Sequence, residues 1–169
     1  MAGPVFPRPD ARKLALLFVA TALVAGCGGG GSRPASTTQR LSGDGFAFEA
    51  PRGWDVAHAA RSLSARSGSQ LVSVTIFRLA HPITPALREK AVAELDRVAD
   101  KLATQESGTV AHARSERIAG RNARAYDIVK SGDDERIAFL LVGRREYQLY
   151  CRGTGSPCTQ LFTSFSLSP

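Results

Sequence analysis

The sequence predicts an α+β fold, in which an antiparallel sheet is covered by helices. Residues 71–79 and 137–142 are apolar on both faces, which is typical of strands inside a covered sheet. One long segment has helical periodicity, and it lies between two groups of strands. Because the loops are short and strands do not alternate with helices, the pattern favours this class over a parallel α/β fold.

Four short strands are expected before the long helix. Phe46 and Phe48 lie on one face of the first, since side chains two residues apart share a face. Gly, Pro and Ser residues mark the turns. The four strands are expected from residue 46, from residue 54, around Leu63 and at 71–79. Turns are expected at 51–53 and 67–69.

A long amphipathic helix follows. Thr84 suits the N-cap and Pro85 suits the first helical position. Apolar residues recur at spacings of four, four, three and four and form one stripe, made of Leu87, Ala91, Leu95, Val98 and Leu102. The helix is expected to end at residues 106–108. We expect the stripe to pack on the chain's own sheet, the alternative being a partner or a membrane.

The C-terminal half is predicted to be an antiparallel meander closed by a short helix. Strands are expected at 110–118, 123–130 and 136–142, with turns at 120–122, 131–134 and 143–144, and Tyr147, Leu149 and Cys151 on one face of the last strand. The closing helix carries its apolar residues at helical spacing: Cys158, Leu161, Phe162 and Phe165.

The N-terminus has the features of a secretory signal. Arg12 and Lys13 precede an apolar run at 14–24, and small residues follow. The run is shorter than the ~20 residues needed to cross a bilayer. The last of these residues, Leu23-Val24-Ala25-Gly26-Cys27, resemble a bacterial lipobox.

This resemblance implies cleavage before Cys27 and attachment of diacylglycerol to its sulfur, with fatty acids such as palmitate. The chain then divides into a signal peptide at 1–26, a lipidated Cys27 with a flexible Gly, Ser, Thr and Pro-rich tether at 27–42, and one domain at 43–169. The alternative is an ordinary signal peptide whose Cys27 is incidental. The expected location is the cell membrane, on its outer face or on the periplasmic side in a cell with two membranes, so the membrane is one partner.

The two other cysteines, Cys151 and Cys158, form an even pair in a chain expected to be exported. We predict a disulfide between them. The alternatives are a metal pair or a nucleophilic thiol. Both require additional side chains, and no His lies near either cysteine in the sequence.

The formal net charge of +7 comes from basic residues that are scattered along the chain. A nucleic-acid partner would require a basic face or stripe, so none is expected. The excess suits weak attraction to anionic lipid headgroups, or simply a solvated arginine-rich surface.

Several motifs together resemble the PsbP-like family. They are Gly45-Phe46-x-Phe48-x-x-Pro51-x-Gly53-Trp54, the long mid-chain helix, Gly120-Arg121 before a strand, and a C-terminal strand, Cys and helix. The family includes the extrinsic photosystem II protein, Mog-type nuclear-transport factors and actinobacterial LpqN-like lipoproteins. The resemblance covers residues 43–167 and implies an α/β/α sandwich around a mostly antiparallel central sheet. It implies binding of proteins or ligands and transfers no catalytic residues.

The sequence contains no catalytic motif that we recognise. We therefore expect that the protein is not an enzyme and that it has no cofactor and no metal site. His58, His81 and His112 lie far apart, and no G-x-S-x-G motif gives a serine a nucleophile's context. Candidate contacts with a partner are Arg121, Arg144 and Arg145, in two predicted turns, because arginine is favoured at interfaces. The alternative is two ordinary polar turns.

The sequence therefore predicts a membrane-anchored, non-catalytic lipoprotein whose domain binds a protein, glycan or lipid in the cell envelope. One alternative is an envelope hydrolase, which would show a pocket that gathers a His, a carboxylate and a Ser. Another is a small-molecule carrier, which would show an enclosed apolar cavity between sheet and helix.

Overall fold

The structure is a computed structural model of the chain, and it describes residues 36–153 and 155–168. The predicted signal peptide and Cys27 lie outside these residues. Within the described part, no helix is long and apolar enough to cross a membrane.

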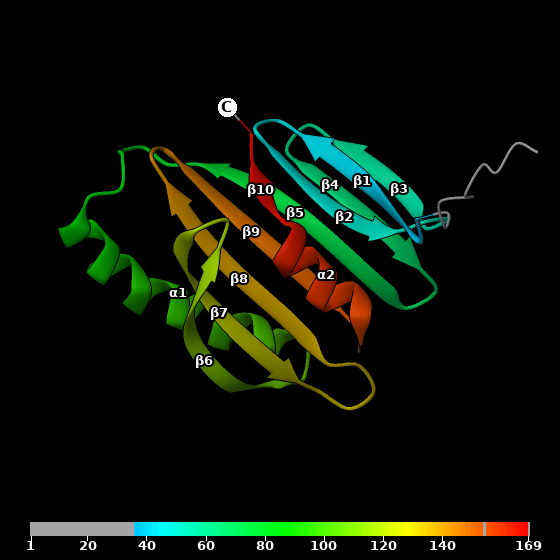
Figure 1. Ribbon diagram of the computed structural model, residues 1–169. Coiled ribbons are helices and arrows are strands. Elements are labelled where there is room, and N and C mark those ends of the chain that lie inside the picture. The colour runs from blue at the N-terminus through cyan, green and yellow to red at the C-terminus, as the bar shows by residue number, and fades with distance from the viewer. Residues whose placement is uncertain (1–35, 154, 169) are drawn as a thin grey trace, which may run out of the picture. The chain divides into compact units, whose positions relative to one another are not determined.

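A seven-stranded, fully antiparallel sheet forms the centre of the domain (Figure 1). Its strands, in spatial order, are β3 (Asp55–Ala59), β4 (Ser62–Ser67), β5 (Gln70–Arg78), β9 (Arg145–Arg152), β8 (Glu135–Val142), β7 (Arg121–Val129) and β6 (Thr109–Ile118). The two strands that are apolar on both faces, β5 and β8, both lie inside the sheet. This position confirms the prediction, because an interior strand has both of its faces available for burial.

A small second sheet contains β1 (Thr38–Gly43), β2 (Phe46–Pro51) and β10 (Ser166–Leu167). Residues 38–42 were expected in the tether, and the structure corrects this boundary, because they pair with β2 from Thr38 onward. The segment is polar and only Leu41 in it is buried, so its sequence carries no apolar alternation. Backbone pairing with β2 makes it a strand.

The main core lies between the large sheet and a layer formed by the small sheet and α2 (Ser156–Ser164). Phe46 is at its centre, with Phe48 stacked at 6.2 Å between ring centroids and Phe165 stacked at 6.1 Å. Tyr147 meets the Phe46 ring edge-on. The predicted alternation of Phe46 and Phe48 is therefore confirmed as the core face of β2.

On the opposite face, α1 (Pro85–Gln105) covers β6, β7 and β8 and forms a second core. The Thr84 hydroxyl accepts a hydrogen bond from the Leu87 amide, which confirms the predicted N-cap. The second core contains Leu95, Ala99, Ala103, Tyr126, Ile128, Ile137, Phe139 and Leu141.

The apolar stripe of α1 is only partly buried. Leu95 is buried, but Leu87 and Val98 are 41% and 36% exposed. Ala99 and Ala103, which lie outside the predicted stripe, are buried in the second core, where small side chains suit a close approach of the helix to β6 and β7. The helix is therefore rotated relative to the predicted stripe.

The layers are thus α1, the large sheet, and α2 with the small sheet (Figure 1). This arrangement confirms the α+β class, the mostly antiparallel central sheet, the long mid-chain helix and the short C-terminal helix. The outer layer around α2 is mixed, since it also contains the small sheet.

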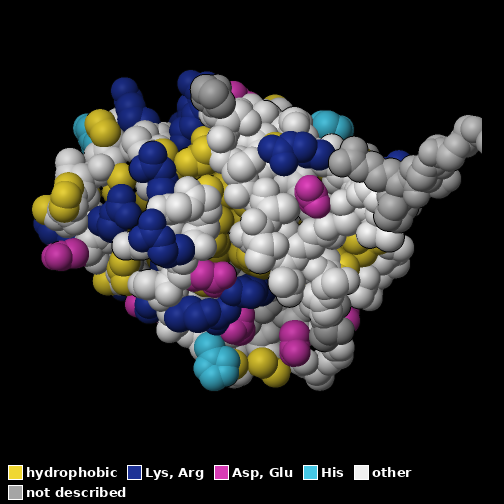
Figure 2. Space-filling model, in the orientation of Figure 1, with side chains coloured by type: hydrophobic (Ala, Val, Ile, Leu, Met, Phe, Trp, Pro, Cys, Tyr) yellow, Lys and Arg dark blue, Asp and Glu magenta, His cyan; other side chains and the backbone are white. Residues whose placement is uncertain are grey.

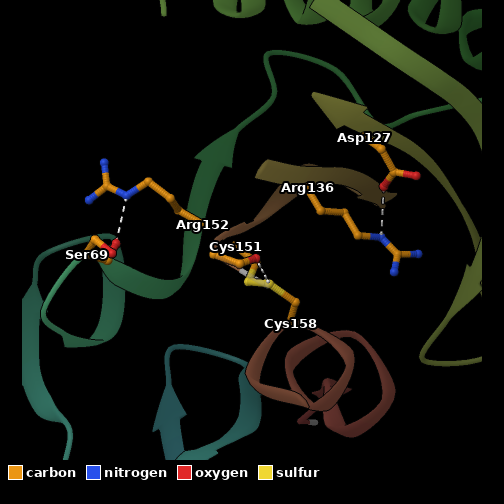
Figure 3. The surroundings of a disulfide bond; sticks show 7 residues. Ser69, Asp127, Arg136, Cys151, Arg152 and Cys158 are labelled. Carbon is orange, nitrogen blue, oxygen red and sulfur yellow. Dashed lines mark hydrogen bonds and ion pairs between the residues drawn. A yellow bond between two sulfur atoms is a disulfide. The ribbon is translucent and has the colours of Figure 1, made fainter. Parts of the chain in front are cut away.

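The predicted disulfide joins Cys151 at the end of β9 to Cys158 in the first turns of α2, with 5.5 Å between the Cα atoms (Figure 3). Cys151 is fully buried in the main core. The bond therefore fastens α2 to the sheet that it covers.

Replacing both cysteines, Cys151→Ala with Cys158→Ala, is expected to lower the free energy of unfolding by about 2–3 kcal/mol, because the short loop gains conformational freedom when unfolded. Urea denaturation measures the loss, and reductant should have no further effect on the double variant. Thiol titration of the folded, unreduced chain checks the bond itself. Two free thiols from this pair would contradict it.

Candidate functional site

Arg121, Arg144 and Arg145 lie at one end of the large sheet. Ala119 and Gly120, with positive φ of 49° and 73°, form the turn before β7, so Arg121 begins that strand rather than standing in the turn. Arg144 follows Gly143 in the β8–β9 turn, and Arg145 begins β9. Since β7 and β8 are antiparallel, the start of β7 lies beside the end of β8. The fold therefore brings the two predicted arginine segments to the same end.

A fourth arginine, Arg78 at the end of β5, joins them. It lies directly opposite Arg145 in the β5–β9 register. Arg78, Leu79, Arg144 and Arg145 line a hollow of about 340 Å³. We call Arg78, Arg121, Arg144 and Arg145 the arginine end. Figure 2 shows Lys and Arg side chains gathered at the upper left, over the part of the molecule where the β8–β9 turn lies in Figure 1.

Hydrogen bonds hold the hollow in shape. Arg144 Nη2 donates to the Ala80 carbonyl at 2.8 Å. Arg145 Nη1 donates to the Asp44 carbonyl at 3.1 Å, and its Nη2 lies 3.4 Å from the Asp44 carboxylate. The Arg144 carbonyl accepts from the Leu79 amide at 2.9 Å. The β8–β9 turn is therefore bonded to the segment that follows β5.

Charge at the arginine end is poorly balanced. Among the described residues, Arg78, Arg121 and Arg144 form no ion pair, and the Asp44 carboxylate pairs only with Arg145. Asp44 is itself 70% exposed at its side chain, so water screens its charge. The guanidiniums at this end therefore remain available to an anionic group.

Two other arginines, Arg114 on β6 and Arg136 on β8, are neutralised within the domain. Arg114 forms two hydrogen bonds with Asp127, and Arg136 pairs with Glu116 and Asp127. The Arg136 guanidinium also lies 4.5 Å from the ring centroid of Phe162 in α2. Figure 3 shows Arg136 and Asp127 beside the disulfide. The ion pairs join β6, β7 and β8, and the Arg136–Phe162 contact joins α2 to the sheet, so these arginines have little capacity for a ligand.

Arg124 is similarly occupied beneath α1. Its Nε donates to Asp96 at 2.9 Å, and the Tyr126 hydroxyl donates to the same oxygen at 2.6 Å. Burial works to raise the pKa of Asp96, but hydrogen bonds from Tyr126 and Arg124 outweigh it and lower that pKa. Burial and the bond to Asp96 raise the pKa of the Tyr126 phenol. This cluster joins α1 to β7.

The cavity between α1 and the sheet, which would serve a carrier, is small. It has a volume of about 120 Å³ and is lined by apolar residues such as Leu95 and Phe139, with Arg88 and Arg124. Binding pockets for small molecules commonly measure ~300–1,000 Å³. Its size does not favour the carrier alternative.

A second hollow, of about 410 Å³, contains groups that matter for the hydrolase alternative. It gathers His112, Asp127 and Thr159 beside Cys158. No Ser lines it among the described residues, and Asp127 already accepts bonds from Arg114 and Arg136. His58 and His81 lie exposed on β3 and in the loop before α1. The described residues hold no group of three or more His, Cys, Asp or Glu side chains suited to a metal ion.

Sequence reasoning did not find Arg78. It is the last residue of β5, and a charged strand end carries no signal of its own. Its importance comes from the register that sets it opposite Arg145. A prediction of that register would have revealed the pair.

No protein-family model matches this chain, and no curated protein matches it in sequence. Among solved structures, the chain is similar to the solution structure of cyanobacterial PsbP (CyanoP) from Synechocystis sp. PCC 6803. The TM-score is 0.58 with 15% sequence identity, over 84% of this chain and 97% of that chain.

The domain has the PsbP fold. A crystal structure from Bacteroides thetaiotaomicron VPI-5482 aligns at a TM-score of 0.48 with 9% identity, over 79% of this chain and 50% of that chain. The likeness to cyanobacterial PsbP confirms the fold that the sequence motifs imply. At this level of identity it carries fold and not activity.

Proposed function

We propose that this protein is an exported lipoprotein, anchored to the cell membrane through Cys27, whose PsbP-like domain binds a partner in the cell envelope without catalysing a reaction. The basic start, short apolar run and lipobox-like residues before Cys27 support the anchor. The Cys151–Cys158 disulfide suits an oxidising compartment outside the cytoplasm.

The single observation that carries the binding function is the arginine end. Its guanidiniums come from β5, β7, the β8–β9 turn and the start of β9, and only Arg145 has a carboxylate partner among the described residues. Planar guanidiniums favour interfaces because they form paired hydrogen bonds with acidic groups and stack on aromatic rings. An acidic partner in the envelope fits this surface.

The direction of β1 also supports this surface. β1 begins at Thr38 and runs toward the β1–β2 turn, where Asp44 pairs with Arg145 (Figure 1). The start of β1, where the chain enters the domain, is therefore at the other end of that strand from the arginine end. Thr38, at the start of β1, therefore does not cover the arginine end.

Membrane fractionation of the wild-type chain and Cys27→Ala tests the anchor. We expect wild-type protein in the membrane fraction, with an intact mass that starts at Cys27 and includes acyl chains. Cys27→Ala should move to the soluble fraction, because a lipid anchor with two or more chains supplies the stable attachment. A soluble, unacylated wild-type protein would contradict the proposal.

Crosslinking in the native envelope tests the binding surface. Arg121→Gln with Arg144→Gln should remove a crosslinked partner that the wild-type chain captures. The matched control is Arg52→Gln with Arg66→Gln, two exposed arginines that form no ion pair among the described residues. Arg52 follows the end of β2 that is far from Asp44, and Arg66 lies opposite the end of β5 that is far from Arg78. Equal loss with both pairs would contradict a specific role for the arginine end.

A further inference from the structure

We propose that the hollow formed by Arg78, Arg144 and Arg145 binds a phosphate group. This inference rests on the proposed function, and it names the chemistry of the partner. We call these three residues the arginine hollow.

The first argument is a pair of like charges that a single carboxylate opposes. Arg78 and Arg145 are directly opposite on neighbouring antiparallel strands, where like charges destabilise a sheet. Arg144 adds a third positive charge at the same hollow. The Asp44 carboxylate is the only described acid that forms an ion pair there. A bound anion would relieve this repulsion.

The second argument is that two of the guanidiniums are already held. Arg144 is fixed on the Ala80 carbonyl and Arg145 on Asp44. Gly45 maintains the second contact, since a Cβ there would lie 2.6 Å from Arg145 Nη1. Donors that are fixed before binding lose less entropy when the ligand arrives. Arg78 is exposed and has no hydrogen bond from its side chain among the described residues, so it is free to close over the ligand.

The third argument distinguishes phosphate from a carboxylate. Each guanidinium presents its N–H donors in a planar fork, and the three arginines line one hollow from two strands and one turn. A carboxylate carries one charge and two oxygens. Arg145 already has one carboxylate partner, that of Asp44. A phosphate group carries up to about two charges and three or more acceptor oxygens. It satisfies three guanidiniums at once.

Thermal unfolding of the full chain in inorganic phosphate tests the proposal. Phosphate should raise the unfolding midpoint by several degrees relative to chloride at equal ionic strength, because a ligand that binds only the folded state stabilises it. Arg78→Gln should weaken phosphate binding roughly 10-fold or more, as expected for loss of a charged hydrogen-bond donor. Without phosphate, its midpoint should equal or exceed that of the wild type, since the repulsion with Arg145 is removed.

Arg66→Gln is the matched control, because Arg66 is an exposed arginine on β4, at the opposite end of the sheet from Arg78. It should respond to phosphate as the wild type does. The proposal is overturned if phosphate raises the unfolding midpoint no more than chloride does. It is also overturned if Arg78→Gln and Arg66→Gln reduce the stabilisation by phosphate equally.

Vesicles distinguish a lipid headgroup from a soluble phosphate compound. The chain with Cys27→Ala, which lacks the predicted anchor, is sedimented with phosphatidylglycerol and with phosphatidylcholine vesicles. Arg78-dependent binding to phosphatidylglycerol supports the proposal with a headgroup as the source. Phosphate stabilisation without vesicle binding supports it with a soluble source. If the chain captures an envelope partner by crosslinking but does not bind phosphate, the phosphate proposal fails and the proposed function stands. If the chain binds phosphate but is not anchored to the membrane, the proposed function fails and the phosphate proposal stands.

Discussion

Replacing Lys130 by Met is expected to destabilise the domain by about 3–5 kcal/mol. Glu135 is 4% exposed and is the one charged side chain buried among the described residues. Lys130 pairs with it and also lies 3.4 Å from Glu106, just beyond α1. Without the ammonium group, the Glu135 carboxylate stays in the protein interior with no cation. Urea denaturation measures the loss.

Two variants make this expectation specific. Replacing both partners, Lys130→Met with Glu135→Leu, should recover most of the stability, because neither charge is then buried alone. Lys101→Met, at an exposed lysine of α1, should change stability by no more than about 0.5 kcal/mol. A loss below about 1 kcal/mol in Lys130→Met would mean that water screens the pair.

The pair also has a pH signature. The hydrogen bond to Glu135 raises the pKa of Lys130 above its ordinary value near 10.5. Its stabilising contribution is therefore complete below pH 10.5 and is lost as the pH rises through the raised value. The gap in stability between the wild type and Lys130→Met should narrow above about pH 10.5, as measured by urea denaturation across pH. The pKa of the Tyr150 phenol is raised, mainly by burial and also by its hydrogen bond to Glu135.

Replacing Leu95 by Ala is expected to lower the free energy of unfolding by about 2–5 kcal/mol. Leu95 is 7% exposed and is the largest side chain that α1 buries in the second core. It also lines the 120 Å³ cavity beneath the helix, so truncation enlarges an existing void. The cost rises with void volume, by about 24 cal/mol per Å³ in one well-studied series. Urea denaturation gives the change.

Val98→Ala is the matched control on the same helix. The sequence places both residues in one stripe, but Val98 is 36% exposed. Its truncation removes little buried surface and should cost under about 1 kcal/mol. Equal costs at the two positions would contradict the rotation of α1 seen in the structure.

The identity and order of most elements could be predicted because their signals are local. Alternating Phe46 and Phe48 report a strand with one buried face, and the Thr84-Pro85 pair reports a helix start. The disulfide could be predicted because two cysteines remain in a chain whose sequence predicts export. Each of these inferences uses residues that are neighbours in sequence.

The positions of the site arginines could be predicted only in part. Residue type near turns points to Arg121, Arg144 and Arg145, and the fold brings these three to one end of the sheet. Arg78 was missed, since its role depends on pairing between β5 and β9. The polar β1 was assigned to the tether because backbone hydrogen bonds to β2, and not apolar side chains, make it a strand.

The fold class, the long helix, the interior strands and the cysteine pair can be read from the sequence, because hydrophobic period and residue type act over a few neighbouring positions. The rotation of α1, the limits of the small sheet and the assembly of the arginine hollow emerge only when the chain is folded. These depend on strand register and helix packing, in which residues far apart in the chain compete for the same space and the same charges.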